Sequence, residues 1–355
     1  MTMTDRPTVS ILIPAFNEVS HIDRCLASVL AQTYPLHEVL VLDGGSTDGT
    51  REKVSVAGPP VRLVDNPGRG PAAAMNVGIA ATTGDVICRI DAHSTYAPDY
   101  VERCVEVLIE TGADVVGGPM RPRATGSFGR AVADVTSSPI AMPGRFHHCT
   151  TRAEVDTVYL GAWRRATLEQ VGGFDADHFP RCGEDNELNF RIRQRGGRVL
   201  LDPTVRSTYS PRETPSGLWR QYQRYGLAKA TSVARHGTLP SWRPVAPAGL
   251  FVATAAGLAI GRTWRARLSV PLAHGLGCLL VGLMVSRKKS DPLRAAFVLE
   301  ICHWSFGLGF WVGIWRFILG QPVQRPLANE RQEPPGRPPL TGTSPSGDWL
   351  GTSRG

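Results

Sequence analysis

The sequence predicts an α/β domain with a mainly parallel sheet and helices on both faces, followed by C-terminal membrane helices. From residue 8 to about 120, short β-branched runs alternate with helical patterns, which is typical of βαβ units. Long apolar stretches with few charges occur only after residue 244. Because single hydrophobic cores stop growing at roughly 250 to 300 residues, a chain of 355 residues has room for both parts.

The elements of the first domain are expected where short apolar runs end in polar residues. Strands are predicted at 9–13, 39–42, 61–64, 86–90 and 115–116. Ser20 is expected to cap the first helix. The buried stripe of that helix is expected to comprise Ile22, Leu26, Val29 and Leu30. Ligands of open parallel sheets bind beyond the carboxyl ends of the strands, so the polar residues at that rim form the candidate site.

Composition restricts the partners and the compartment. The formal net charge of +8 favours anionic partners such as phosphates, acidic lipids or nucleic acid, without choosing among them. No interleaved aromatic pattern accompanies the basic residues, so no nucleic-acid module is indicated. The seven cysteines are scattered without a C-x-x-C pair, which indicates neither a disulfide framework nor a zinc ribbon and fits a reducing compartment. The polar N-terminus lacks the features of a secretory signal, so the first domain is expected in the cytoplasm.

The apolar residues of the C-terminal part fall into separate stretches. A helical membrane region is expected at 241–320, with apolar segments at 245–261, 268–285 and 295–319. The first two segments are near the lower limit for crossing a bilayer core of about 30 Å, so they either span the membrane or form a shallow hairpin. The Pro-, Gly- and Ser-rich tail at 321–355 is expected to be disordered.

The third apolar stretch also carries ionisable residues. It holds Glu300, His303 and Arg316. Because an ionisable group at bilayer depth is costly, these side chains are expected to face other helices or the membrane interface. The tryptophans of the same stretch fit an interfacial aromatic belt.

Two segments at the strand ends carry candidate ligand-binding residues. Asp43 ends a predicted strand before two glycines, where its carboxylate either accepts a hydrogen bond from a nucleotide base or forms a turn. Asp91 and His93 share one face of an extended segment, so both can reach one divalent ion. Imidazole suits Mn²⁺ better than Mg²⁺. The alternative for Asp91 is a structural Asp turn.

Two helical segments supply further candidates. Glu184 and Asp185 open a helical pattern, where Asp185 is either a general base or a carboxylate that complements the helix dipole. Gln221, Arg224 and Tyr225 share one face of a later helix. Arg binds diphosphates through paired donors, and Tyr stacks on a sugar or base. The alternative is a basic helix that leads to the membrane.

Taken together, several segments between residues 8 and 226 resemble the family 2 glycosyltransferases, which have the GT-A nucleotide-diphospho-sugar transferase fold. The matching segments are 10–18 (SILIPAFNE), 41–50 (VLDGGSTDGT), 68–76 (GRGPAAAMN), 172–175 (GGFD), 183–185 (GED) and 221–225 (QYQRY), the last resembling the family's Q-x-x-R-W motif.

The resemblance implies a domain at 1–240 and a role for each site residue. It implies that Asp43 contacts the base, that Asp91 with His93 supports a divalent ion, Mn²⁺ or Mg²⁺, and that Asp185 is the catalytic base of an inverting displacement. The further substrate-binding residues implied by these motifs are Pro14, Glu18, Arg69, Glu184, Gln221, Arg224 and Tyr225. Residues 121–180, rich in Pro, Gly and Arg, are expected to form an acceptor-side region with long loops.

Three residues depart from the family pattern. Gly44 stands where a second Asp is usual, His93 replaces the last Asp of D-x-D, and Tyr225 replaces Trp. The Asp-Ala-His form and the C-terminal apolar stretches most resemble bacterial enzymes of succinoglycan-type exopolysaccharide assembly. This implies a UDP-sugar donor, with a GDP-sugar as the second choice, and a lipid-linked or other glycan acceptor. It also implies a place in the inner cell membrane, with the catalytic domain cytoplasmic.

Other protein classes account for parts of the sequence. The segment 68–73 (GRGPAA) fits the G-x-G-x-x-A pattern of a dinucleotide-dependent oxidoreductase. A non-catalytic nucleotide- or lipid-binding membrane protein is a second alternative, because a fold can persist after its activity is lost. The cluster at 147–149 (HHC) resembles a zinc ligand set, but no second ligand pair lies at a usual spacing, so a polar loop is expected there.

Overall fold

The predicted sheet is present in the computed structural model, which describes residues 6–144, 148–238, 245–286 and 291–325. The strands of this sheet lie side by side in the order β3 (Val61–Asp65), β2 (Glu38–Asp43), β1 (Val9–Ala15), β4 (Val86–Arg89), β8 (Tyr159–Arg164), β6 (Val115–Gly118), β9 (Val199–Leu201) and β7 (Ala153–Glu154). The strands from β3 to β4 are parallel, whereas β8 is antiparallel to both of its neighbours. The sheet is therefore mixed but mainly parallel, as the sequence predicts.

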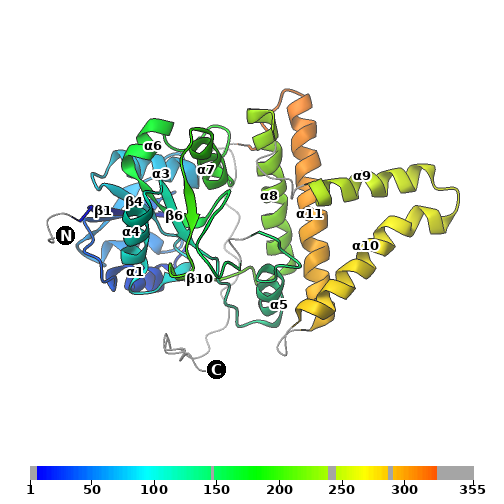
Figure 1. Cartoon of the computed structure of the whole chain (residues 1–355), viewed down its shortest axis with the longest axis horizontal. Coiled ribbons are helices and arrows are strands. Elements are labelled where there is room, and N and C mark those ends of the chain that lie inside the picture. The colour runs from blue at the N-terminus through cyan, green and yellow to red at the C-terminus, as the bar shows by residue number, and fades with distance from the viewer. Residues whose placement is uncertain (1–5, 145–147, 239–244, 287–290, 326–355) are drawn as a thin grey trace.

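Helices cover both faces of the sheet (Figure 1). They are α1 (Ile22–Leu30), α2 (Thr50–Ser55), α3 (Pro71–Ala80), α4 (Tyr100–Thr111), α6 (Arg165–Val171) and α7 (Glu184–Gln194). Side chains alternate along β1, so Ile11 and Ile13 pack with α1 and α4, while Leu12 packs with α3, α6 and α7. This alternation divides the apolar residues of the domain between two cores.

The start of the first helix differs from the prediction. Helix α1 begins at Ile22, with His21 as its N-cap residue and no side-chain capping bond. The backbone N–H groups of His21 and Ile22 instead donate to the carbonyl of Glu18, which gives the helix start its hydrogen-bond partner without Ser20. Of the expected stripe, Leu30 is 44% exposed. The other three residues of the stripe are buried.

A second, two-stranded sheet was not predicted from the sequence. Strand β5 (Ser94–Tyr96) pairs with β10 (Ser207–Tyr209), and Pro122 forms a bridge to Tyr209. Because β5 follows the segment that contains Asp91 and His93, this small sheet fixes the chain directly after the candidate metal residues.

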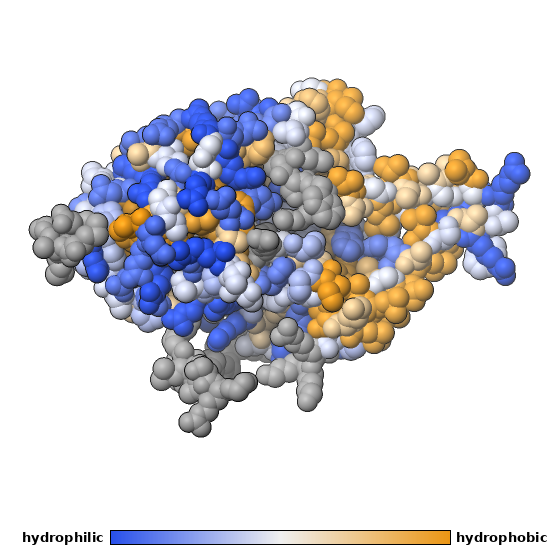
Figure 2. All heavy atoms as spheres, viewed as in Figure 1, coloured by the Kyte–Doolittle hydropathy of each residue, from blue (hydrophilic) through white to orange (hydrophobic). Residues whose placement is uncertain are grey.

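The C-terminal helices pack against the α/β domain. They are α8 (Pro215–His236), α9 (Val245–Ile260), α10 (Trp264–Val285) and α11 (Pro292–Ile318), and the internal helix α5 (Ser127–Thr136) packs beside α11. Helix α11 lies beside α8, whereas α9 and α10 project away from the α/β domain (Figure 1). The projecting helices present a largely apolar surface that ends in a polar tip (Figure 2). In the described part of the chain, α10 and α11 are long and apolar enough to cross a membrane, and α9 is shorter.

Two glycines bring the backbones of α8 and α11 close together. A Cβ atom added at Gly226 would lie 2.1 Å from the carbonyl oxygen of Phe306, and one added at Gly309 would lie 2.0 Å from that of Gln223. Only glycine fits at such contacts, so the sequence itself specifies that α11 docks on α8.

The expected disordered tail does not begin at residue 321. Val323 and Gln324 are buried, and the Gln324 side-chain amide donates to the carbonyl of Cys182, directly before α7. Val323 and Gln324 are therefore packed on the domain, whereas residues 321, 322 and 325 are exposed. The remainder of the predicted tail, 326–355, lies outside the described residues.

Candidate active site

A cavity of about 190 Å³ opens at the carboxyl ends of β1, β2 and β4. The predicted site residues that line it are Pro14, Glu18, Arg69, Asp91 and His93. Asn66 and Arg89 also line the cavity and were not predicted. The position agrees with the general rule that open parallel sheets bind ligands beyond the carboxyl ends of their strands.

Asp43 lies buried at the end of β2, and its two carboxylate oxygens have different surroundings. One oxygen, Oδ2, accepts backbone N–H bonds from Gly45 and Ser46 at 3.0 Å and a bond from Arg51 Nη1 at 2.7 Å. Burial alone would raise the pKa of Asp43, but the hydrogen bonds from Ser46 and Arg51 hold it below its usual value. The other oxygen, Oδ1, is buried without a partner among the described residues. Asp43 is not among the residues that line the cavity, although its neighbour Leu42 is.

Asn66 presents a second unpaired acceptor beside Asp43. The backbone N–H of Asn66 donates to the carbonyl of Asp43 at 2.8 Å, so the two residues are neighbours on β2 and the segment after β3. The Asn66 side chain donates to the carbonyl of Gly70, while its Oδ1 is buried without a described partner. Buried acceptors are normally satisfied, so two unpaired acceptors at one rim mark a place for a hydrogen-bond donor.

Gly44, where the family pattern usually has a second Asp, lies against the loop of Arg69. A Cβ atom at Gly44 would lie 3.1 Å from the carbonyl oxygen of Arg69, which is tight for a side chain. The Arg69 side chain is exposed, and its guanidinium lies near Gly45. The glycine thus lets the loop carrying Arg69 approach the turn at Gly44 and Gly45.

Asp91 and His93 both face the cavity. Asp91 Oδ1 accepts a bond from Arg89 Nε at 3.1 Å, and His93 Nδ1 lies 3.3 Å from Glu18 Oε1. Burial alone would lower the pKa of His93, but the Glu18 hydrogen bond and the Asp91 charge raise it. One carboxylate and one imidazole leave most positions around a divalent ion for other ligands, such as donor phosphate oxygens. The donor set fits such an ion.

Arg89 links this rim to the start of α7. Its Nη1 donates to Glu184 Oε1 at 2.8 Å, and its Nε donates to Asp91, so one buried guanidinium holds both carboxylates. Burial raises the pKa of Glu184, although the Arg89 charge opposes that change. The second oxygen of Glu184 is buried without a described partner. Asp185 follows at the first turn of α7 and is half-buried.

The predicted residues of α8 are only partly brought together. Gln221 donates to the hydroxyls of both Tyr209 and Tyr225, and the Tyr209 ring packs edge-on against His93. Gln221 and Tyr225 are thereby connected to the candidate metal residues. Arg224 is exposed, and its backbone carbonyl accepts from the Cys182 thiol, which places it beside the segment that leads into α7.

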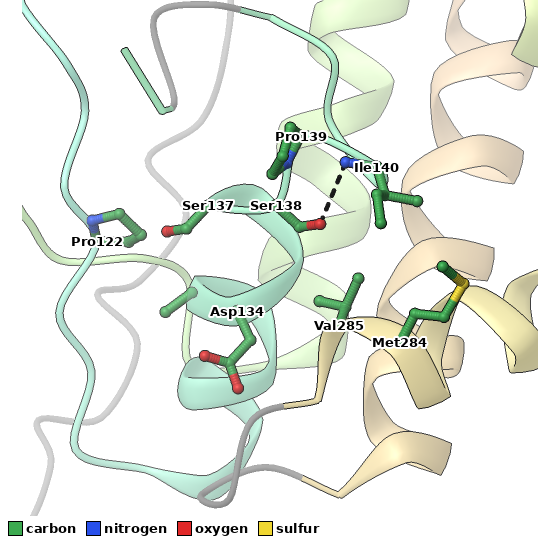
Figure 3. Close-up of a pocket in the computed structure, with 9 residues that line it drawn as sticks. Pro122, Asp134, Ser137, Ser138, Pro139, Ile140, Met284 and Val285 are labelled. Carbon is green, nitrogen blue, oxygen red and sulfur yellow. Dashed lines mark hydrogen bonds between the residues drawn. The ribbon is translucent and has the colours of Figure 1, made fainter. Parts of the chain in front are cut away.

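A second cavity, of about 300 Å³, lies between α5 and the end of α10 (Figure 3). Its lining combines Asp134 and Ser137 with apolar Met284 and Val285. One carboxylate oxygen of Asp134 is buried without a described partner. Pro122 also lines this cavity, and its bridge to Tyr209 connects the cavity to the small sheet beside His93. Residues of the predicted acceptor-side region, 121–180, thus line a cavity together with residues of the apolar helix α10.

The fold and the site define a nucleotide-sugar transferase of the GT-A class. The model of the family described as "Glycosyl transferase family 2" matches residues 10–172. The chain is also 33% identical over 319 residues to succinoglycan biosynthesis protein ExoA of Rhizobium meliloti. This alignment covers 85% of this chain and 93% of that protein. The chain belongs to glycosyl transferase family 2.

Two further comparisons are consistent with this assignment. A Methanococcus voltae enzyme, dolichyl N-acetyl-alpha-D-glucosaminyl phosphate 3-beta-D-2,3-diacetamido-2,3-dideoxy-beta-D-glucuronosyltransferase, is 25% identical over 240 residues, 64% of this chain and 74% of that protein. The mannosyltransferase PcManGT from Pyrobaculum calidifontis, solved in complex with GDP-Man and Mn²⁺, is similar in structure, with a TM-score of 0.61, 24% identity and 88% of each chain covered. The latter likeness shows the shared GT-A fold.

Sequence reasoning missed three residues that organise the site. Arg89 shares the face of Asp91 on an extended segment, so the alternation along β4 was a usable signal. Asn66 follows the third strand at the same rim as Asp43, which was also a usable signal. Tyr209 gave no local signal, because strand β10 has only three residues and its role depends on contacts with distant segments.

Proposed function

We propose that the chain is an inverting glycosyltransferase that moves a sugar from a UDP-sugar to a lipid-linked glycan acceptor in exopolysaccharide synthesis. The observation that carries the proposal is the shared contact of Arg89 with Asp91 and Glu184. Through this contact, Arg89 joins the strand that leads to Asp91, which lines the cavity, to the start of α7, which carries the candidate base Asp185. A site that holds a donor diphosphate next to a base is what sugar transfer requires.

The donor nucleotide is assigned to the rim of β2 and β3. The unpaired oxygens of Asp43 and Asn66 are suited to accept N–H groups from the base. Asp91 and His93 are the residues that would hold a divalent ion, which neutralises charge on the leaving diphosphate when it is bound. The exposed Arg69 adds a cation at the same cavity. The Mn²⁺ and GDP-Man in the PcManGT structure are compatible with this assignment.

The acceptor is assigned to the side of the cavity that faces α7. Asp185 removes the proton from the attacking hydroxyl, and the unpaired oxygen of Glu184 accepts a hydroxyl of the bound sugar. The helix start also stabilises carboxylates in their charged form, which suits a general base. Transfer to the face opposite the leaving diphosphate gives inversion at the anomeric carbon.

The C-terminal helices are assigned to the membrane. Helix α10 has 22 residues. At 1.5 Å per residue its length is about 33 Å, close to the thickness of a bilayer core of about 30 Å. The hairpin of α9 and α10 enters the inner membrane from the cytoplasmic side, and α11 lies between this hairpin and the catalytic domain. The cavity beside Asp134 and Met284 then lies where a lipid-linked acceptor leaves the bilayer.

The relatives support this class of acceptor. ExoA is named for succinoglycan biosynthesis, and the name of the Methanococcus voltae enzyme includes a dolichyl-linked sugar phosphate. The dinucleotide alternative finds no support in the topology, because its glycine segment follows β3 at the edge of the sheet. A dinucleotide fingerprint turn follows the first strand of the fold, which here is the central β1.

Donor turnover by the purified full-length chain in detergent tests the proposal. UDP- and GDP-sugars are supplied with polyprenyl-diphosphate-linked sugars as acceptors, in the presence of Mn²⁺, Mg²⁺ or a chelator. We expect transfer from one UDP-sugar, greatest with Mn²⁺. Tight binding of NAD(H) without affinity for UDP or GDP would overturn the assignment in favour of an oxidoreductase. Nucleotide binding without any turnover would favour a non-catalytic binding protein.

A further inference from the structure

A polar cluster lies between α10 and α11, away from the active site. His274 Nε2 and His303 Nδ1 are 2.9 Å apart, and Cys278 Sγ is 3.6 Å from His274 Nε2. One nitrogen or sulfur atom from each of these three side chains lies within 4.8 Å of the others. The helices that carry the cluster are otherwise strongly apolar. Such a group of imidazole and thiol ligands has no part in the proposed sugar transfer.

Two of the three separations between the ligand atoms can be compared with those of a tetrahedral zinc site, and the third, between Cys278 and His303, is within 4.8 Å. With Zn–N bonds of 2.0–2.1 Å and Zn–S bonds of about 2.3 Å, tetrahedral ligands lie about 3.3 Å apart for two nitrogens and about 3.6 Å apart for nitrogen and sulfur. The Cys278 to His274 distance already matches this value. A small rotation of one imidazole ring widens the His274 to His303 separation to accommodate the ion.

The surroundings of His274 prepare it to bind a metal. Glu300 Oε2 lies 3.1 Å from His274 Nδ1, and the indole N–H of Trp304 donates to the same carboxylate oxygen at 2.6 Å. A carboxylate at Nδ1 places the proton on that nitrogen and leaves the lone pair of Nε2 free to ligate. Metal-binding histidines are commonly oriented by a second group of this kind.

The cluster lies in a place where unpaired ionisable side chains would cost folding free energy. Ionisable side chains within apolar helices lose solvation, so they persist where they bind a ligand or one another. The alternative to a metal site is that the cluster only forms hydrogen bonds between α10 and α11. Such a link needs one polar side chain on each helix, whereas this cluster has three. A thiol at hydrogen-bond distance from an imidazole, with Glu300 behind that imidazole, is instead the composition of a metal site.

We propose that His274, Cys278 and His303 bind one Zn²⁺ ion that fastens α10 to α11. Binding releases the thiol proton of Cys278, and His303 ligates through Nδ1 while its own proton resides on Nε2. Water supplies the fourth ligand. The ion is structural, because no described residue of the active site lies among its ligands. Helix α10 is mostly exposed, so a metal link to α11 gives it a fixed position.

Metal content of the full-length chain in detergent tests this site. After incubation with Zn²⁺ and removal of free metal, we expect about one Zn²⁺ per chain and a raised thermal unfolding midpoint. Replacement of Zn²⁺ by Co²⁺ is expected to give a thiolate-to-cobalt charge-transfer band. Cys278→Ser is expected to lose both the band and the retained metal.

Cys302→Ser is the matched control. Cys302 is buried on α11 next to His303 in the sequence, but its thiol contacts Tyr222 on α8. This variant is expected to keep the metal and the cobalt band, and size-exclusion profiles check that both variants fold. A wild-type chain that retains no Zn²⁺ contradicts the proposal. A Cys278→Ser variant that retains as much metal as wild type contradicts it equally, and leaves hydrogen bonding between the helices as the role of the cluster.

Discussion

The guanidinium of Arg89, at the end of β4, donates to Glu184, at the start of α7, across 2.8 Å. The two residues are 95 positions apart in the chain, and each is at most 11% exposed at its side chain. Their contact fixes the helix that carries Asp185 against the strand that leads to Asp91. The position of α7 relative to β4 therefore rests on this buried ion pair.

Breaking this ion pair on one side should destabilise the domain strongly. Arg89→Met leaves the Glu184 carboxylate buried without its partner, and such a change typically costs about 3–5 kcal/mol of folding free energy. We expect a large fall in the thermal unfolding midpoint of the full-length chain. The double variant Arg89→Met with Glu184→Gln should recover part of that loss, because the buried Glu184 charge is gone, while Asp91 still lacks its Arg89 partner. Equal stability of the single variant and wild type would show that the pair does not hold α7.

Asn66 should affect the affinity for the donor nucleotide. Asn66→Ala removes an acceptor next to Asp43, and one hydrogen bond of about 1–1.5 kcal/mol corresponds to roughly a tenfold loss of affinity. We expect the KM for the nucleotide-sugar to rise by about that factor, while the KM for the acceptor stays the same. Steady-state kinetics with each substrate varied in turn measures both values. A rise confined to the acceptor KM would place Asn66 outside the nucleotide site.

His93 should set the preference for the metal ion. With one imidazole and one carboxylate, the wild-type chain is expected to be more active with Mn²⁺ than with Mg²⁺. His93→Asp supplies a second carboxylate, which suits Mg²⁺, so the ratio of activity with Mg²⁺ to activity with Mn²⁺ should rise. Chelation should abolish transfer in both proteins. Unchanged activity of the wild-type chain in excess chelator would remove the metal from the mechanism.

The docking of α11 on α8 should depend on Gly309. Gly309→Ala places a Cβ atom 2.0 Å from the Gln223 carbonyl oxygen, so the helices must separate. We expect a lower unfolding midpoint and faster proteolysis of the C-terminal helices. Gly277→Ala on α10 is the control, because an added Cβ there meets no atom within 4 Å. Equal unfolding midpoints and proteolysis rates for the two alanine variants would show that close packing at Gly309 does not hold α11 on α8.

Much of the α/β domain was predictable from the sequence, because it is built from local patterns. The short apolar runs before Asp43 and Asp91 predicted strands β2 and β4. Because both residues follow the carboxyl ends of these strands, they were expected at the same edge of the sheet. The predicted start of the first helix was wrong by one residue, because the first N–H groups are bound by the backbone carbonyl of Glu18 and not by a side chain.

The contacts that depend on distant segments were not predictable. The hydrogen bond from Gln221 to Tyr209 had no local signal, because Tyr209 lies on a three-residue strand. The zinc ligand set was missed for a related reason. His274 and Cys278 are four residues apart on one helix, which was a usable signal, but His303 joins them only through the packing of α10 on α11.

Asp185→Asn tests whether Asp185 is the base at the donor site that Arg89 holds together. The amide keeps the size of the side chain but cannot take a proton. We therefore expect transfer to fall by about 10² to 10⁴-fold, the usual contribution of a general base, while the affinity for the nucleotide-sugar, measured by calorimetry, stays at the wild-type value. Transfer at the wild-type rate in this variant would contradict the account.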